Sequence, residues 1–138
     1  TRSARGVGVG RERRSRYLGE RLVVLRGEIC LVDLDPTRGS EANKRRPAVI
    51  VSNDGANSTA TRLGSGVVTV VPVTSNVERV YPFQVLLAAR QTGLPRDSKA
   101  QAEQVRSIAV ERVGRLMGQL PPPLMALLDD ALRLHLGL

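Results

Sequence analysis

The sequence predicts an α+β domain that is mostly β, built as a small antiparallel barrel or a strongly bent sheet with one C-terminal helix. Five or six short segments rich in β-branched and apolar residues are separated by irregular, turn-rich connections, a pattern typical of such sheets. The last segment, PPPLMALLDDALRLHLGL, is the best helix candidate because its apolar residues recur at a helical period. The length of 138 residues fits one such domain.

The predicted strands are short. PAVIVSN (47–53) is a continuous apolar run that fits a buried central strand, with Pro47 tolerated at its first residue. VVTVVPVT (67–74) is β-branched, and Pro72 within it predicts an edge strand or a bulge. Strands are expected over 26–36, 47–53, 67–74, 83–88 and 99–108, and a helical turn with a short strand over 109–118.

The connections between these strands are rich in turn-forming and polar residues. Residues 37–46, 54–66, 75–82 and 90–98 are therefore expected to be loops, with at most one helical turn around 57–62. The last three of these loops are expected to set the specificity of a site built at the strand ends.

The C-terminal helix carries a wide apolar arc. Pro122 or Pro123 suits its first turn. Steps of about 100° per residue from Leu124 give an arc of roughly 200°, wider than the stripe of about 100° that a one-sided helix needs. The arc holds Leu127, Leu128, Ala131, Leu132, Leu134, His135 and Leu136. We therefore expect this helix to pack on the sheet and on a second protomer, giving a homodimer in which His135 is a core or interface residue.

The net charge of +8 is concentrated near the N-terminus. Residues 1–26 hold eight arginines against two glutamates, a net of +6, so the rest of the chain carries only +2. Residues 1–24 have too few apolar side chains to fold alone, so we expect a basic, disordered arm before a domain over 25–138. The arm lacks the apolar stretch of a signal peptide, and no segment has the apolar length of a membrane span.

The counts of cysteine, histidine and aromatic residues limit the chemistry. Cys30 and His135 are the only residues of their kinds, so one chain can form neither an intrachain disulfide nor a Cys/His zinc site. A cytoplasmic location fits the single cysteine. With two tyrosines, one phenylalanine and no tryptophan, recognition of a nucleic acid would depend mainly on hydrogen bonds.

Two stretches place polar side chains at the ends of predicted strands. In NKRRPAVIVSND, Arg46 directly precedes a strand, so a rigid element would hold a guanidinium whose planar donors match phosphate oxygens, while Lys44 and Arg45 lie on the loop in solvent. In PVTSN, Thr74 ends a strand and is followed by two polar residues. Taken singly, each stretch equally fits an ordinary exposed loop.

Two further stretches add carboxylates. Glu41 shares a loop with Arg46, where it is an ion-pair partner, a general base or an acceptor for a base edge. In AEQVRS, alternation along a strand would send Gln104 and Arg106 to one face and Glu103 to the other. The simpler alternative for this stretch is a polar strand face.

Together these stretches carry a family resemblance. DLDPTRGSEANKRRPAVIVSND, VVPVTSN, YPFQVLLA and AEQVRSI follow one another at spacings that resemble the MazF/PemK (Kid) family of toxin endoribonucleases over about residues 25–138. The GSE–x–RP–strand unit followed by P-x-T is specific, whereas each fragment alone is weak. The similarity is greatest to the mycobacterial and Bacillus-type MazF branch.

The resemblance implies a fold and an activity. Family members are SH3-like (CcdB/PemK-type) barrels that act as homodimers and as toxins of type II toxin–antitoxin systems. They cut single-stranded RNA (mRNA or tRNA) at short sequence motifs without a metal or other cofactor. The 2′-hydroxyl attacks the adjacent phosphorus, which leaves a 2′,3′-cyclic phosphate and a 5′-hydroxyl. A MazE-like antitoxin inhibits them by laying an extended, largely acidic segment along the RNA site.

The resemblance also implies site residues. Arg46 matches the arginine of the RP motif and Thr74 the threonine of the P-x-T motif, the two residues held catalytic in the MazF branch. Glu41 matches an acidic residue that acts as base or as RNA contact. The residues expected to bind RNA are Ser40, Lys44, Ser75, Asn76, Glu103 and Gln104.

The sequence departs from the family at two places. Kid-type members use an arginine and an aspartate on the late strand as acid and base, and the matching positions here are Gln101 and Glu103. Glutamine cannot titrate, and arginine stays protonated far above neutral pH, so the general base is left open. Cys30 stands where the family has an aromatic residue, which alters either packing or a base-contact surface.

Two other functions are known on barrels of this kind, and the sequence argues against both. A CcdB-like toxin that binds DNA gyrase without cutting depends on C-terminal aromatic and small residues, typically with a tryptophan, and this chain ends in HLGL. An SH3-like binding module needs an aromatic-lined groove for proline-rich peptides, which three aromatic residues do not supply.

Overall fold

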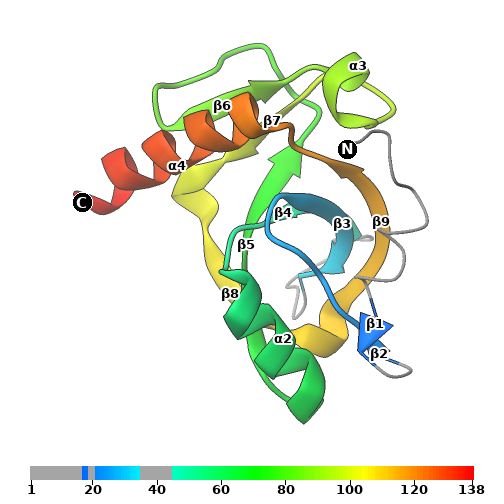
Figure 1. Cartoon of the computed structure of the whole chain (residues 1–138). Coiled ribbons are helices and arrows are strands. Elements are labelled where there is room, and N and C mark those ends of the chain that lie inside the picture. Colours follow the sequence, from blue (N-terminus) through cyan, green and yellow to red (C-terminus); the bar gives the residue numbers. More distant parts are fainter. Residues whose placement is uncertain (1–16, 19–20, 35–44) are drawn as a thin grey trace, which may run out of the picture.

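The structure is a computed structural model that describes residues 17–18, 21–34 and 45–138. Its strands and helices confirm the α+β, mostly β class with a C-terminal helix (Figure 1). In chain order they are β1 (Tyr17–Leu18), β2 (Arg21–Leu22), β3 (Glu28–Asp33), β4 (Arg45–Ile50), α2 (Asp54–Leu63), β5 (Val67–Thr74), β6 (Gln84–Leu87), α3 (Ala89–Thr92), β7 (Ser98–Gln101), the 3₁₀ turn η1 (Ala102–Gln104), β8 (Arg106–Ala109), the 3₁₀ turn η2 (Val110–Arg112), β9 (Val113–Gln119) and α4 (Pro122–Leu136).

Within the described residues, the strands from β3 to β9 form one seven-stranded sheet in which every pairing is antiparallel. The strand order is β6-β7-β5-β4-β3-β9, and β8 pairs with β5 off this path. Figure 1 shows the sheet curling strongly, with β9 bent around β3. The strongly bent sheet that the strand pattern predicts is therefore present, and β4 and β5 lie in its middle.

The two faces of the central strands enter two different apolar cores. Val49 packs in a core with Leu128 of α4, whereas Ala48 and Ile50 pack in a second core with Ala60 of α2. Because both faces of β4 are buried, its sequence is a continuous apolar run instead of an alternating one. The strand begins at Arg45, so Arg46 lies inside β4 and not directly before it.

Cys30 lies fully buried in the core on the α2 side and forms no disulfide with a described residue. Its substitution for an aromatic residue of the family pattern therefore changes packing inside the domain. A base-contact surface at this position is excluded because the side chain does not reach solvent.

Strand β5 is neither an edge strand nor bulged, so the prediction from Pro72 is wrong. Its register with β4 is continuous and includes the pair Ala48–Pro72. On its other side β5 pairs with β8 as far as Val70 and with β7 from Val73 onward. Pro72 therefore lies where β5 changes partners, at a point where the missing N–H costs no ladder hydrogen bond.

Residues 54–63 form helix α2, which is longer than the single turn predicted for this segment. Asn53 caps the helix, since its Oδ1 accepts a hydrogen bond from the Ala56 backbone N–H at 2.8 Å, and Gly64 ends it in the left-handed conformation. Helix α2 leads to the first residue of β5, Val67, whereas Thr74 is the last residue of that strand. Seven steps along a strand separate Val67 from Thr74 by about 23 Å. The end of α2 therefore lies far from Thr74 along β5, and the role of the segment 54–66 in specificity stays a prediction.

The single strand predicted over 99–108 is also wrong. Residues 98–101 form β7, the 3₁₀ turn η1 interrupts the chain at 102–104, and residues 106–109 form β8. The interruption is required because β7 and β8 pair with different ends of the same strand, β5. Glu103 and Gln104 lie in the turn, so strand alternation does not govern their directions.

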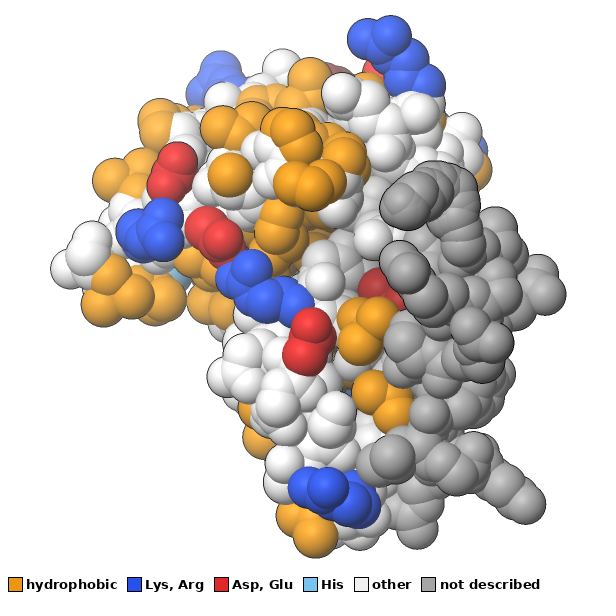
Figure 2. All heavy atoms as spheres, in the orientation of Figure 1, with side chains coloured by type: hydrophobic (Ala, Val, Ile, Leu, Met, Phe, Trp, Pro, Cys, Tyr) orange, Lys and Arg blue, Asp and Glu red, His pale blue; other side chains and the backbone are white. Residues whose placement is uncertain are grey.

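Helix α4 confirms the predicted C-terminal helix, and its apolar arc is only partly covered. Leu124, Leu128 and Ala131 are buried against the sheet, whereas Leu127 and Leu134 are 53% and 60% exposed. Figure 2 shows hydrophobic side chains gathered over this helix. His135 is exposed in the single chain, so a core position is wrong and an interface position stays a prediction. None of the helices in the described part of the chain is long and apolar enough to span a membrane.

Little of the predicted N-terminal arm falls within the described residues. Strands β1 and β2 pair with each other, and Val23 and Val24, directly after β2, are buried. Val24 belongs to the core on the α2 side. The boundary between an arm over 1–24 and a domain over 25–138 stays a prediction.

Candidate functional site

A pocket lies where β4 begins and β5 ends. The β4–β5 pairing runs Ile50–Val70, Val49–Val71 and Ala48–Pro72, so it ends two residues from Arg46 on β4 and two residues from Thr74 on β5. Both residues line one hollow of about 290 Å³. Its lining consists of Arg45, Arg46, Pro47, Val73, Thr74, Ser75, Leu94, Pro95, Arg96 and Ser98.

The pocket is cationic. Arg45, Arg46 and Arg96 contribute three guanidinium groups, and no described carboxylate lines the pocket with them. Arg45 faces Asp33 across the β3–β4 pairing and also lines a second hollow with Asp33 and Glu111. Arg46 is exposed, and its side chain makes no hydrogen bond or ion pair within the described part of the chain. Arg46 therefore has donors available for an anion.

The hydroxyl of Thr74 already takes part in one hydrogen bond. Its Oγ1 accepts a hydrogen bond from the Asn76 backbone N–H at 3.2 Å, which fixes the chain as it leaves β5. Asn76 in turn uses its Oδ1 to accept from the Glu78 backbone N–H at 3.2 Å. The O–H of Thr74 remains able to donate to a ligand oxygen. Ser75 is exposed and adds a second hydroxyl to the pocket lining.

Glu103 and Gln104 do not line this pocket. They lie in η1, beyond the C-terminal end of β7, whereas the pocket is at the N-terminal end of that strand near Ser98. The Oε2 of Glu103 accepts a hydrogen bond from Gln84 Nε2 at 2.7 Å. Within the described residues its buried Oε1 has no hydrogen-bond partner. The place of Glu103 outside this pocket does not fit the acid–base role that the resemblance to Kid-type members implies for this position.

Three predicted residues, Ser40, Glu41 and Lys44, lie outside the described residues. Arg45 lines the pocket although the sequence predicted it in solvent on a loop, and the sequence did not predict two further polar residues of the lining, Arg96 and Ser98. These two belong to the turn-rich segment 90–98, whose composition predicts a loop but not where the loop lies. The only sequence signal for Arg96 was its charge within a loop already expected to affect specificity.

The arrangement suits the binding of an anion with oxygen acceptors. Guanidinium groups and hydroxyls are donors for phosphate oxygens, and a partly enclosed pocket strengthens such charge-assisted bonds. Among the described residues, no group of three or more His, Cys, Asp or Glu side chains is placed to hold a metal ion. The fold and the pocket therefore define a small antiparallel-sheet protein with a cationic pocket that suits an anion bearing oxygen acceptors.

Comparison with known proteins is consistent with this class. The family model for the PemK-like, MazF-like toxin of type II toxin–antitoxin systems matches residues 25–136. The chain is 68% identical over 113 residues to the endoribonuclease MazF9 of Mycobacterium tuberculosis, covering 82% of this chain and 96% of that protein. It is 30% identical over 118 residues to the endoribonuclease EndoA of Bacillus subtilis, covering 85% and 97%.

A solved structure shares the fold. An endoribonuclease in complex with its cognate antitoxin from a mycobacterial species aligns with a TM-score of 0.65 at 25% identity, covering 83% of this chain and 96% of that one. The chain therefore belongs to the PemK-like, MazF-like family of toxins of type II toxin–antitoxin systems. The family resemblance in the sequence, including its mycobacterial and Bacillus-type branch, is confirmed.

Proposed function

We propose that this endoribonuclease toxin holds the scissile phosphodiester of single-stranded RNA in the pocket formed by β4, β5 and the loop before β7. The observation that carries the proposal is that Arg46 and Thr74, from separate strands, line one cationic pocket. A guanidinium and a hydroxyl on opposite faces of the sheet could not act on a common phosphate.

The proposed reaction is an intramolecular transfer. The 2′-oxygen of the ribose forms a bond to the adjacent phosphorus while the bond from phosphorus to the 5′-oxygen breaks. The 2′-hydroxyl gives its proton to a general base, and the leaving 5′-oxygen takes up a proton. The products are a 2′,3′-cyclic phosphate and a 5′-hydroxyl, and the reaction needs no metal.

Arg46 and Thr74 have different roles in this step. The Arg46 guanidinium stabilises the negative charge that gathers on the phosphorane, and the Thr74 hydroxyl donates to a phosphate oxygen. Groups of this kind each contribute about 10²–10³-fold in rate. Their side chains touch the reacting group, so both are catalytic residues in this proposal.

Glu41 is the proposed general base. It belongs to the segment that enters β4 at Arg45, five residues before Arg46, and the described lining of the pocket supplies no carboxylate. Ser40, Lys44, Ser75 and Asn76 flank the three catalytic positions in the chain and are proposed RNA contacts. Glu103 and Gln104 are at the far end of β7, so they would contact a nucleotide distant from the cleaved bond.

The proposed partners are an antitoxin and a second copy of this chain. The mycobacterial relative is an endoribonuclease in complex with its cognate antitoxin, and an acidic antitoxin segment would fit the cationic pocket of this chain. The uncovered face of α4 forms an apolar hollow with β6, lined among others by Leu86, Leu127 and Leu134. An apolar surface of this kind marks a protein interface. A cytoplasmic location remains a prediction.

The dimer is tested by the mass of the protein in solution. We expect a dimer by light scattering at micromolar concentration, and we expect Leu134→Glu to give a folded monomer because a charge would enter the interface. Leu63→Glu is a matched control, since Leu63 is exposed to a similar extent, at 67%, but belongs to α2. A monomeric wild-type protein would reject this interface.

The activity is tested with a long single-stranded RNA incubated with the purified chain in EDTA. We expect discrete cuts that end in 2′,3′-cyclic phosphate and begin with 5′-hydroxyl. Intact RNA, or cuts that appear only when a divalent metal is added, would contradict the proposed reaction. Sequencing of the 5′-hydroxyl ends then identifies the cleavage motif.

A further inference from the structure

The wall of the pocket opposite β4 carries a guanidinium that the proposed reaction does not use. Arg96, in the loop between α3 and β7, lines the pocket together with Arg46 and Thr74. Arg96 is exposed, and its side chain makes no hydrogen bond or ion pair with another described residue. Its donors are therefore available to a ligand, as those of Arg46 are.

The loop that carries Arg96 is held on both sides. Before it, Leu94 is only 5% exposed and packs in the core on the α4 side. After it, Asp97 Oδ1 accepts a hydrogen bond from the Ala89 backbone N–H at 2.8 Å, and Ser98 Oγ donates to the Arg96 carbonyl at 3.0 Å. The backbone at Arg96 is thus fixed before a ligand arrives, which lowers the entropy cost of binding.

A close contact with β9 also supports this loop. A Cβ atom on Gly118 would lie 2.2 Å from the Thr92 carbonyl oxygen, a distance that no side chain tolerates. Gly118 therefore lets the end of α3 pack directly on β9. The position of Arg96 follows from packing between two segments that are distant in the sequence.

The charges in the pocket exceed those of one phosphate group. A phosphodiester carries one negative charge, whereas Arg46 and Arg96 line the pocket with no described carboxylate beside them, and the third arginine, Arg45, faces Asp33 across the β3–β4 pairing. Arg46 and Arg96 also approach from different sides, because β4 and β7 flank β5. Two strand spacings, or about 10 Å, separate the backbones of β4 and β7, so the two arginines enter the pocket from well-separated parts of the sheet.

We propose that Arg96 binds the phosphate next to the scissile one, and so positions the RNA strand for cleavage. The inference rests on the proposed function, because it assigns Arg46 and Thr74 to the scissile phosphate. Arg96 acts on a group that is the same in the ground state and in the transition state. Its loss should therefore weaken substrate binding and leave the rate of the bound complex unchanged.

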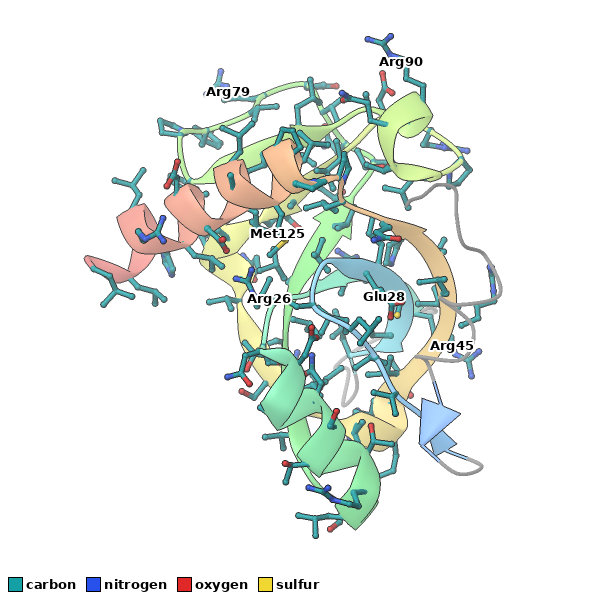
Figure 3. The ribbon with its side chains drawn as sticks, in the orientation of Figure 1. Arg26, Glu28, Arg45, Arg79, Arg90 and Met125 are labelled. Atoms are coloured by element: carbon teal, nitrogen blue, oxygen red, sulfur yellow. The ribbon has the colours of Figure 1, made fainter. Side chains whose placement is uncertain are left out.

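The test compares Arg96→Ala with Arg90→Ala on a short RNA that contains one mapped cleavage site. Arg90 lies six residues earlier, on α3, and projects outward from the molecule (Figure 3). For Arg96→Ala we expect KM to rise about tenfold with kcat within about twofold of the wild type. The slope of log affinity against log salt should fall by about 0.7, as for one lost contact to a single strand. Arg90→Ala should behave as the wild type, and Arg96→Lys should recover part of the loss. Thermal unfolding of each variant checks the fold.

A chemical change in the RNA gives the second arm of the test. Each phosphate flanking the cleaved bond is replaced in turn by a neutral methylphosphonate. Replacing the phosphate that Arg96 binds should weaken RNA binding by the wild type about as much as Arg96→Ala weakens binding of the unmodified RNA. The same replacement should not weaken RNA binding by the Arg96→Ala variant any further. Equal effects of Arg96→Ala and Arg90→Ala, or a fall in kcat at unchanged KM, would overturn the assignment while leaving the nuclease proposal intact. Failure of the wild type to cut the unmodified RNA would reject both.

Discussion

Two arginines of this domain differ in how their donors are used. Arg26 lies between α2 and α4, as Figure 3 shows, and its guanidinium is bonded to other segments of the fold. Its Nε donates to the Val51 carbonyl at 2.8 Å, its Nη2 contacts Asp129 Oδ1 at 2.5 Å, and its backbone N–H donates to Asp54 Oδ1 at 2.7 Å. Arg46 makes no side-chain bond to any described residue. The engaged arginine joins distant segments of the fold, whereas the one at the pocket keeps its donors for a ligand.

The largest effect is expected at Arg46. Arg46→Ala should lower cleavage by at least about 10²–10³-fold, because it removes the charge that stabilises the phosphorane. The free energy of unfolding should stay within about 1 kcal/mol, since the side chain is exposed. Single-turnover cleavage and urea unfolding measure the two quantities. Arg106→Ala, an exposed arginine on β8, is the control, and cutting by Arg46→Ala at the wild-type rate would break the distinction between the two arginines.

The next effect is expected at Thr74. Thr74→Val removes the hydroxyl while keeping the shape of the side chain and its preference for a strand, so cleavage should fall by about 10²-fold. Thr69 lies earlier on the same strand, outside the pocket lining, and Thr69→Val should cut normally. Equal rates for the two variants would show that the hydroxyl is not needed. Cleavage kinetics on one RNA give the comparison.

A smaller effect, on stability and not on activity, is expected at Arg26. Arg26→Met keeps the apolar stem but leaves Asp129 and the Val51 carbonyl without their partner, which should cost about 1–2 kcal/mol of unfolding free energy. Arg133→Met removes an exposed bridge to Asp130 and should cost less than about 0.5 kcal/mol. Urea unfolding measures both losses. Cleavage by folded Arg26→Met could also fall as far as cleavage by Arg46→Ala does. That result would show that the hydrogen bonds of an arginine side chain within the fold do not distinguish structural from functional arginines.

The elements that follow a plain periodicity were predictable from the sequence. The β-branched segment 67–74 is β5, and the apolar period after Pro122 is α4. Helix α2 was missed because its small polar residues are typical of loops, and its ends depend on Asn53 and Gly64 acting as caps. A capping asparagine with a glycine eleven residues later was the available signal.

The site was predictable only in part. The ends of two predicted strands singled out Arg46 and Thr74, and both residues line one pocket, whereas their catalytic roles stay a prediction. Arg96 was missed because its position depends on the packing of Leu94 and Gly118, contacts between segments far apart in the chain. Glu103 was misplaced because the change of partner along β5 bends the chain at η1, which no local pattern records.

Strand β5 changes partners along its length and, like β4, lies between the two cores. Its Val70 and Val71 belong to different cores, so the strand loses its surroundings only when both cores separate. The central amides of β5 should then exchange with deuterium at the rate set by global unfolding, and later than those of α3 or the loop that carries Arg96. Partial opening of the molecule would therefore displace the loop that carries Arg96 while Thr74 stays in position on β5. RNA binding would then weaken before the catalytic residue on β5 is displaced.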